Sequence, residues 1–277
     1  MRITNNMLIS NMMQNLSNNL TRTQKYQNQL ATGKKISLPS DDPIVASKAL
    51  KLRTDVAEIT QYKRNTDDAT SWMDMTEATM KQLTEVLHRM SEITTQAANG
   101  TNTPDDLLKI ESEAEQLRNQ LISLGNTTYA GRYIFSGYKT DKPLLKDDGT
   151  FNVDISNSEQ VKFEISIGDD VNVNVPGSDL FNNGADALAG DKSGFVDTFD
   201  QVITAMKSDD KAELSDLLGD MEGQLENLLR VRAGLGARMN RVDLTANRLD
   251  DNNVNFTKLM SKNEDVDMAE AIMNLLS

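Results

Sequence analysis

The chain contains no cysteine, one histidine and one tryptophan, and aromatic residues make up only 5% of its 277 positions. Without cysteine there is no disulfide framework, no thiolate metal site and no cysteine nucleophile. The single histidine, His88, lies beside a predicted helical seam, so we expect it to be exposed and inert. A Ser-His-Asp arrangement and a histidine metal site are therefore not credible. The composition predicts a protein that is not an enzyme and has no catalytic, metal or cofactor site.

Positive charge is also scarce, with 29 Lys and Arg against 42 Asp and Glu, a formal charge of -13 and an isoelectric point near 4.6. Such a chain would not neutralise phosphates, so we expect neither a nucleic-acid partner nor an anionic membrane partner. The first residues, MRITNNMLISNMMQNL, are interrupted by Asn and Ser and lack the apolar core of a cleaved signal. No apolar run approaches the length of a membrane-spanning helix.

Small acidic and glycine-rich motifs have ordinary structural interpretations. The acidic pairs lack the spacing of a calcium loop, and we expect helix capping and turn chemistry to explain most of them; they stand at 41–42, 67–68, 169–170 and 209–210. The segment AGLGAR (233–238) lacks a third glycine and a preceding strand, so it is not a dinucleotide fingerprint. We expect the glycines of this region to weaken the helix locally and to allow close backbone approach; they are Gly219, Gly223, Gly234 and Gly236.

Apolar residues recur every three or four positions along most of the chain, which is the period of helices packed along a narrow seam. This pattern predicts helices over 9–30, over 43–98 without interruption, over 104–124 and from 195 onward, with a break near Asn263. The second helix would be roughly 80 Å long, too long to wrap a compact core. Between 133 and 183 the period changes to alternation, with turn signals at Asp148-Gly149, Gly168-Asp169 and Pro176-Gly177. The predicted fold is mainly α: a long antiparallel coiled-coil rod built from both chain ends, with a small β-rich inserted domain.

The segment LATGKKISLPSDDPIVASKAL (30–50) predicts a joint between two helices. Gly33 is expected to end the first helix in the left-handed conformation, with Lys34 and Lys35 near its C-terminal end. Asp42 followed by Pro43 is a strong helix start, because the carboxylate caps and proline fits the first helical position.

Residues 30–50 and 65–80 together resemble the N-terminal region of bacterial flagellins and related axial proteins, and 235–275 is similar to their C-terminal region. Within this family, YAGRYIFSGYKTDKPLL (129–145), the short insertion after it and Trp72 are more similar to the proteins that join hook to filament than to flagellin. The resemblance implies that the terminal helices pair into an inner tube layer, with a helical rod outside it and the β domain on the surface.

The same resemblance implies an extracellular flagellar component, exported unfolded through the flagellar type III channel without a cleaved signal. Its implied partners are other copies of the chain in a short helical layer, flagellin, a neighbouring hook-associated protein and an export chaperone that binds the C-terminal region. The expected segments are the inner-tube helix (1–38, disordered or differently held in isolation), two halves of the rod (39–135 and 193–262), the insertion (136–192) and a last segment (263–277). Family members usually continue beyond that last segment, so it is expected to be truncated or unusually short.

The methionine-rich ends carry apolar faces that are either packed within the chain or used to meet other copies or a chaperone, and the second interpretation is favoured. The predicted subunit contacts lie in the joint, at Lys34, Asp41 and Asp42, and in the terminal seams, at Leu16, Leu20, Phe256 and Met260. A structural adaptor between hook and filament is the leading hypothesis. A flagellin-type filament subunit and a secreted coiled-coil effector or adhesin are the alternatives.

Overall fold

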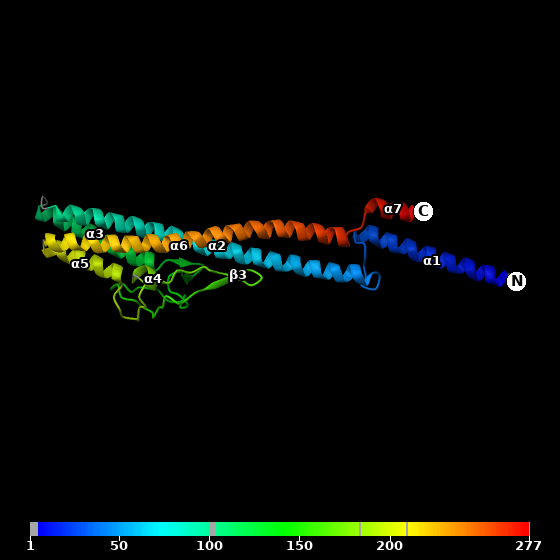
Figure 1. Cartoon of the computed structure of the whole chain (residues 1–277), viewed down its shortest axis with the longest axis horizontal. Coiled ribbons are helices and arrows are strands. Elements are labelled where there is room, and N and C mark those ends of the chain that lie inside the picture. Colours follow the sequence, from blue (N-terminus) through cyan, green and yellow to red (C-terminus); the bar gives the residue numbers. More distant parts are fainter. Residues whose placement is uncertain (1–4, 100–102, 183, 209, 277) are drawn as a thin grey trace. The chain divides into compact units, whose positions relative to one another are not determined.

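The computed structural model describes residues 5–99, 103–182, 184–208 and 210–276. Helices dominate these residues (Figure 1), and they are α1 (Asn5–Thr32), α2 (Pro43–Ala98), α3 (Pro104–Gly125), α4 (Gly177–Phe181), α5 (Gly194–Ser208), α6 (Lys211–Glu264) and α7 (Met268–Leu276). The strands are short and form two antiparallel pairs, β1 (Thr128–Tyr129) with β2 (Arg132–Tyr133), and β3 (Lys162–Ser166) with β4 (Asp169–Asn172). The prediction of a mainly α fold with a small β-containing insertion is confirmed.

By its internal contacts the chain divides into two compact units. The terminal unit comprises residues 1–61 and 248–277, and the central unit comprises residues 62–247. α2 has 56 residues and α6 has 54, and each contributes to both units. The terminal unit therefore combines the two ends of the sequence, whereas the central unit is one continuous stretch.

The long helices begin and end where local signals predict. α2 begins at Pro43 and ends at Ala98 without a break. α3 begins after Thr103, whose hydroxyl accepts a hydrogen bond from the amide of Asp106 (3.3 Å). Thr103 is therefore the N-cap of this helix. α6 runs to Glu264, which places the predicted break near Asn263.

The glycines of α6 do not behave as predicted. The helix is continuous through all of them, and a Cβ added at any of the four positions would meet no other segment within 4 Å. They face open space, and tertiary packing of the apolar face outweighs their low helix propensity. The expectation of close backbone approach is therefore wrong for this helix, and local weakening of the helix stays a prediction.

The central unit packs its helices antiparallel (Figure 1). Contacts between α2 and α6 run in opposite directions along the two helices, from Glu77 with Arg232 to Thr94 with Met221. Ion pairs between α3 and α5 show the same arrangement, from Arg118 with Asp200 to Glu111 with Lys207.

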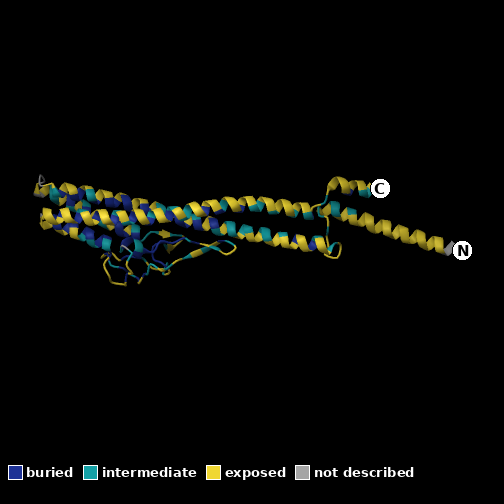
Figure 2. Cartoon of the chain, viewed as in Figure 1, coloured by how far each residue is buried: buried dark blue, intermediate teal, exposed yellow. Residues whose placement is uncertain are grey.

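An aromatic cluster lies where the insertion meets these helices. Phe181 of α4 packs edge-on against Phe135 (ring centroids 5.9 Å apart) and against Phe195 of α5 (5.5 Å), and all three rings are fully buried. Figure 2 shows the buried residues on the facing sides of the helices, while the outer sides are exposed. His88 is exposed, as expected.

The insertion is less regular than its alternating sequence suggests. The turn between β1 and β2 consists of Ala130 and Gly131, both with positive φ, which is the two-residue turn that suits a right-twisted hairpin. Regular pairing beyond it is confined to β3 and β4, and isolated bridges such as Ile155 with Ala187 join the loops. The alternation correctly predicts the buried residues Ile165, Val171, Val173 and Val175, but Ile167 lies at the exposed tip of the hairpin.

α6 holds this hairpin through arginine. The Arg238 guanidinium donates to the backbone carbonyls of Asn172 (3.1 Å) and Asn174 (3.0 Å), and its burial lowers the pKa of the group. Arg241 forms an ion pair with Asp169 at the other end of β4. Two arginines on one face of α6 therefore fix the edge of the insertion.

Candidate assembly site

The joint between α1 and α2 is closed by its own polar side chains. Gly33 has φ +71°, and its amide donates to the carbonyl of Gln29 (2.8 Å), so α1 ends as predicted. The Asp42 carboxylate accepts hydrogen bonds from the amides of Ile44 (3.0 Å) and Val45 (3.1 Å) and caps α2.

Asp41 closes the loop before that cap. Its carboxylate accepts hydrogen bonds from the amides of Leu38 (3.0 Å) and Ser37 (3.3 Å). These donors, with Leu38 first, hold the pKa of the Asp41 carboxyl below its ordinary value. Both acidic residues of the predicted joint thus have partners within it, and their contact with another subunit stays a prediction.

The residues that follow α6 pair with the joint as a short antiparallel ladder. The amide of Lys35 donates to the carbonyl of Glu264 (2.7 Å), and the amide of Val266 donates to the carbonyl of Gly33 (3.0 Å). The facing pair between these bonds is Lys34 with Asp265. Their side chains form an ion pair (2.8 Å), and the Lys34 ammonium, followed by the Ser261 hydroxyl, lowers the pKa of the Asp265 carboxyl.

Glu264 is the buried charge of this region, with 3% of its side chain exposed. Arg53 of α2 binds both of its carboxylate oxygens, from Nε (3.1 Å) and from the terminal nitrogen. The ammonium of Lys34 lies 3.6 Å from the same carboxylate. The side-chain amide of Asn263 also donates a hydrogen bond to the backbone carbonyl of Val45 (3.1 Å).

A cavity of about 210 Å³ opens beside this carboxylate. It is lined mainly by apolar residues of the joint and of the first turns of α2, namely Ile36, Leu38, Pro39, Ala46, Ala49 and Leu50, together with Ser37, Arg53 and Glu264. Leu38 and Leu50 remain 60% and 61% exposed. The joint therefore presents an uncovered apolar rim beside the buried carboxylate of Glu264.

The apolar face of α1 is largely uncovered. Leu16 is 54% exposed and Leu20 63%, and the same holds for Met7, Leu8, Ile9, Met12 and Met13. α7 packs against α1 and buries Ala271, while Met268, Ile272 and Met273 stay exposed. Phe256 and Met260 on α6 are half-buried. Large exposed apolar surfaces are typical of interaction sites, and contact of this face with another subunit stays a prediction.

The sequence-predicted contact residues fall into two groups. The structure brings Lys34, Asp41 and Asp42 into one joint and leaves Leu16 and Leu20 on an open helix face. Sequence reasoning missed Arg53 and the acidic run that holds Lys34. The signal was available, because the acidic segment NEDVD (263–267) follows the last long helix and complements the Lys34-Lys35 pair.

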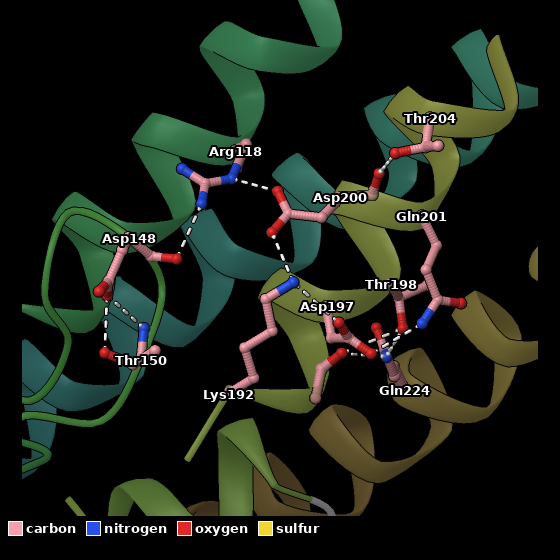
Figure 3. A network of polar contacts seen from close by, with 11 residues as sticks. Arg118, Asp148, Thr150, Lys192, Asp197, Thr198, Asp200, Gln201, Thr204 and Gln224 are labelled. Carbon is pink, nitrogen blue, oxygen red and sulfur yellow. Dashed lines mark hydrogen bonds and ion pairs between the residues drawn. The ribbon is translucent and has the colours of Figure 1, made fainter. Parts of the chain in front are cut away.

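A second polar cluster, in the central unit, joins the insertion to α3 and α5 (Figure 3). Asp200 pairs with Arg118 (2.5 Å) and with Lys192 (3.1 Å). Lys192 also pairs with Asp197, and this hydrogen bond, followed by the one to Asp200, raises the pKa of the Lys192 ammonium. Arg118 donates in addition to the carbonyl of Asp148 (3.1 Å). The charges of this cluster pair with one another and hold the loop at 147–148 and Lys192 against α3 and α5.

Two further observations apply to the described residues alone. No group of three or more His, Cys, Asp or Glu among them is arranged to hold a metal ion. None of the described helices combines the length and apolarity needed to cross a membrane.

Residues 3–140 match the N-terminal helical region of bacterial flagellin, and residues 218–277 match its C-terminal helical region. The chain belongs to the flagellin family. Members of this family are structural proteins of the bacterial flagellum, and this chain is a structural flagellar component.

Within the flagellin family, the chain is 29% identical to flagellar hook-associated protein 3 of Escherichia coli (strain K12), with 100% of this chain and 92% of that protein covered. It is also 29% identical to flagellin of Bacillus subtilis (strain 168), with 98% and 89% covered. The crystal structure of Bacillus cereus FlgL has the same fold, with a TM-score of 0.65 and 25% identity over 76% of this chain and 99% of that one. Identity alone thus does not separate the two kinds of flagellin-family protein.

Proposed function

We propose that this chain joins the hook to the flagellin filament by assembling into a short helical layer. The observation that carries the proposal is the similarity to hook-associated protein 3 over the whole chain, insertion included. The segment 129–145, which resembles the junction branch, leads directly into that insertion. The insertion itself is held to α6 by Arg238 and Arg241. These contacts fix its position on the helix, which suits an outer domain of an adaptor.

The exposed apolar faces of α1 and α7 support self-association of the chain ends. We infer that segments 1–38 and 263–277 form the inner tube layer, that 39–135 and 193–262 form the rod, and that 136–192 is the outer domain. In this arrangement Leu16, Leu20, Phe256 and Met260 meet other copies, and the joint around Lys34, Asp41 and Asp42 lies where copies touch. The partners above and below are flagellin and another hook-associated protein.

We further propose export through the flagellar type III channel to the extracellular flagellum, with a chaperone holding the C-terminal region beforehand. The methionines of α7 support this assignment, because exposed Met268 and Met273 form a face that can adapt to more than one partner.

A flagellin-type filament subunit is the second candidate, supported by the 29% identity to Bacillus subtilis flagellin over 98% of this chain. Immunogold labelling of native flagella with antibodies against the insertion separates the two. A single narrow band of label at the boundary of hook and filament is expected. Label along the whole filament would assign the chain to the filament, and a pre-immune serum controls for background.

A further inference from the structure

The segment 264–266, which we call the strap, closes over the joint at 33–35. It contributes two backbone hydrogen bonds and the Lys34–Asp265 ion pair. Two other contacts act within the joint alone, namely the Asp41 loop and the Asp42 cap. The strap is therefore the part of the joint that comes from the far end of the chain.

The position of Glu264 is electrostatically costly by itself. It is the last residue of α6, where the helix dipole already places negative charge, and it is almost fully buried. A buried carboxylate is tolerated only when cations and hydrogen bonds replace its water. Arg53 from α2 and Lys34 from the joint supply these cations, and the other charge nearby, Asp265, is bound to Lys34.

We propose that residues 264–266 have two states, seated against the joint and unseated, and that the pairing of Glu264 with Arg53 stabilises the seated state. We therefore call Glu264 the catch. The joint closes only when the C-terminal segment is seated in it. Seating the strap pairs Glu264 with Arg53 and completes the ladder to Gly33 and Lys35. Unseating it leaves Arg53 and Lys34 without these partners and frees the end of α1 from α6. The direction of α1 at the joint is thus coupled to the placement of residues 264–266.

The coupling has a consequence for any partner of the chain end. A protein that binds the backbone and carboxylates of residues 264–266 must break the ladder hydrogen bonds and the ion pairs with Lys34 and Arg53, because the same atoms cannot serve both partners. The joint at 33–35 and Arg53 therefore compete with that partner for the segment 264–266.

A disulfide trap tests closure directly in the full chain, which has no cysteine of its own. Lys34 and Asp265 face each other between two ladder hydrogen bonds, so they form a non-hydrogen-bonded pair with Cα atoms about 4.5 Å apart, within disulfide range. The variant Lys34→Cys/Asp265→Cys should form an intramolecular disulfide under mild oxidation, detected as a loss of two free thiols in a monomer. Failure to cross-link would overturn the proposal.

The catch is tested by adding Glu264→Gln to the cysteine pair. This change keeps the shape and removes the charge, and it should slow disulfide formation at least about tenfold, because Arg53 loses its buried counter-ion. Glu270→Gln is the matched control, since that carboxylate is exposed on α7 and should leave the rate unchanged. An unaltered rate in Glu264→Gln would show that the strap seats without the catch.

Amide exchange gives a second readout without cysteines. In Glu264→Gln alone, exchange at Lys35 and Val266 should accelerate, since their acceptors belong to the strap contact. Exchange at Leu38 should not, because its acceptor is Asp41 in the same loop. Faster exchange at all three amides, or in α3 as well, would mean general unfolding and would contradict a local catch.

Discussion

The guanidinium of Arg53, near the start of α2, binds both carboxylate oxygens of Glu264, the last residue of α6. This contact joins positions 211 residues apart through a carboxylate that is almost fully buried. Together with the ladder between 33–35 and 264–266, it makes the joint a product of both chain ends.

The uncovered face of α1 should be required for assembly and not for folding. Leu16→Asp/Leu20→Asp should abolish self-association, because it places charge on a face that would otherwise be buried against other copies. The far-ultraviolet circular dichroism and the Tm of the central unit should stay close to those of the parent chain, since both side chains are exposed. Sedimentation velocity measures the first effect. Loss of helix content in the variant would show that this face belongs to the core of the chain.

The Asp200 carboxylate should stabilise the central unit. Asp200→Asn removes the counter-ion of Arg118, whose side chain is 17% exposed, and should lower the free energy of unfolding by about 1–3 kcal/mol. Urea denaturation checks the value. Glu92→Gln is the control, because it breaks only the exposed pair with Arg89 and should change the free energy of unfolding much less. Equal effects of the two changes would contradict the assigned role of Asp200.

The joint should loosen in acid. Lys34 and Ser261 lower the pKa of Asp265, and the Leu38 and Ser37 amides lower that of Asp41. A carboxyl whose pKa is lowered by folding stabilises the folded state above its unfolded pKa, and this contribution is lost as the pH falls through the folded value. Protection of the joint amides should therefore be constant above roughly pH 4, near the unfolded value for aspartate, and fall below it. Loosening between pH 6 and 8, in exchange data corrected for the intrinsic pH dependence, would contradict this.

Self-association should rise with ionic strength. The central unit carries 18 basic and 32 acidic residues, a formal charge of -14, whereas the terminal unit carries +1. Copies that meet through their terminal units bring acidic central units near one another, and salt screens that repulsion, with a Debye length of about 8 Å at physiological ionic strength.

Light scattering of the purified chain in increasing NaCl measures this effect. The Leu16→Asp/Leu20→Asp variant is the control, and it should not respond to salt because it lacks the apolar face. Association that weakens with salt would indicate attractive ion pairs between copies instead.

Local signals predicted the helices well and the joint in part. The Asp42-Pro43 start, the Gly33 end and the Thr103 cap depend on residues a few positions apart, so sequence alone reveals them. Arg53 and Glu264 are 211 residues apart, and no local pattern links them. Pairing of the two ends was expected from the helical seams and from the family resemblance, but the contact itself was missed, although the complementary charges of Lys34-Lys35 and NEDVD indicate it.

The insertion was harder to predict for a different reason. Its alternating valines and isoleucines indicated strands, but much of its backbone is held by turns, by isolated bridges and by side chains, and not by a continuous sheet. Asn126, for example, binds both the amide and the carbonyl of Leu145 with its side-chain amide. Such contacts depend on how distant segments pack together, and the alternation of apolar and polar residues does not predict that packing.

The central claim is that this chain joins hook to filament, and a clean deletion in the source bacterium tests it most directly. Electron microscopy of the cells and flagellin in the culture medium are the two readouts. The proposal predicts hooks without filaments, with unpolymerised flagellin in the medium. Normal filaments and normal swimming would contradict it, and filament loss with no flagellin in the medium would identify the chain as the filament subunit.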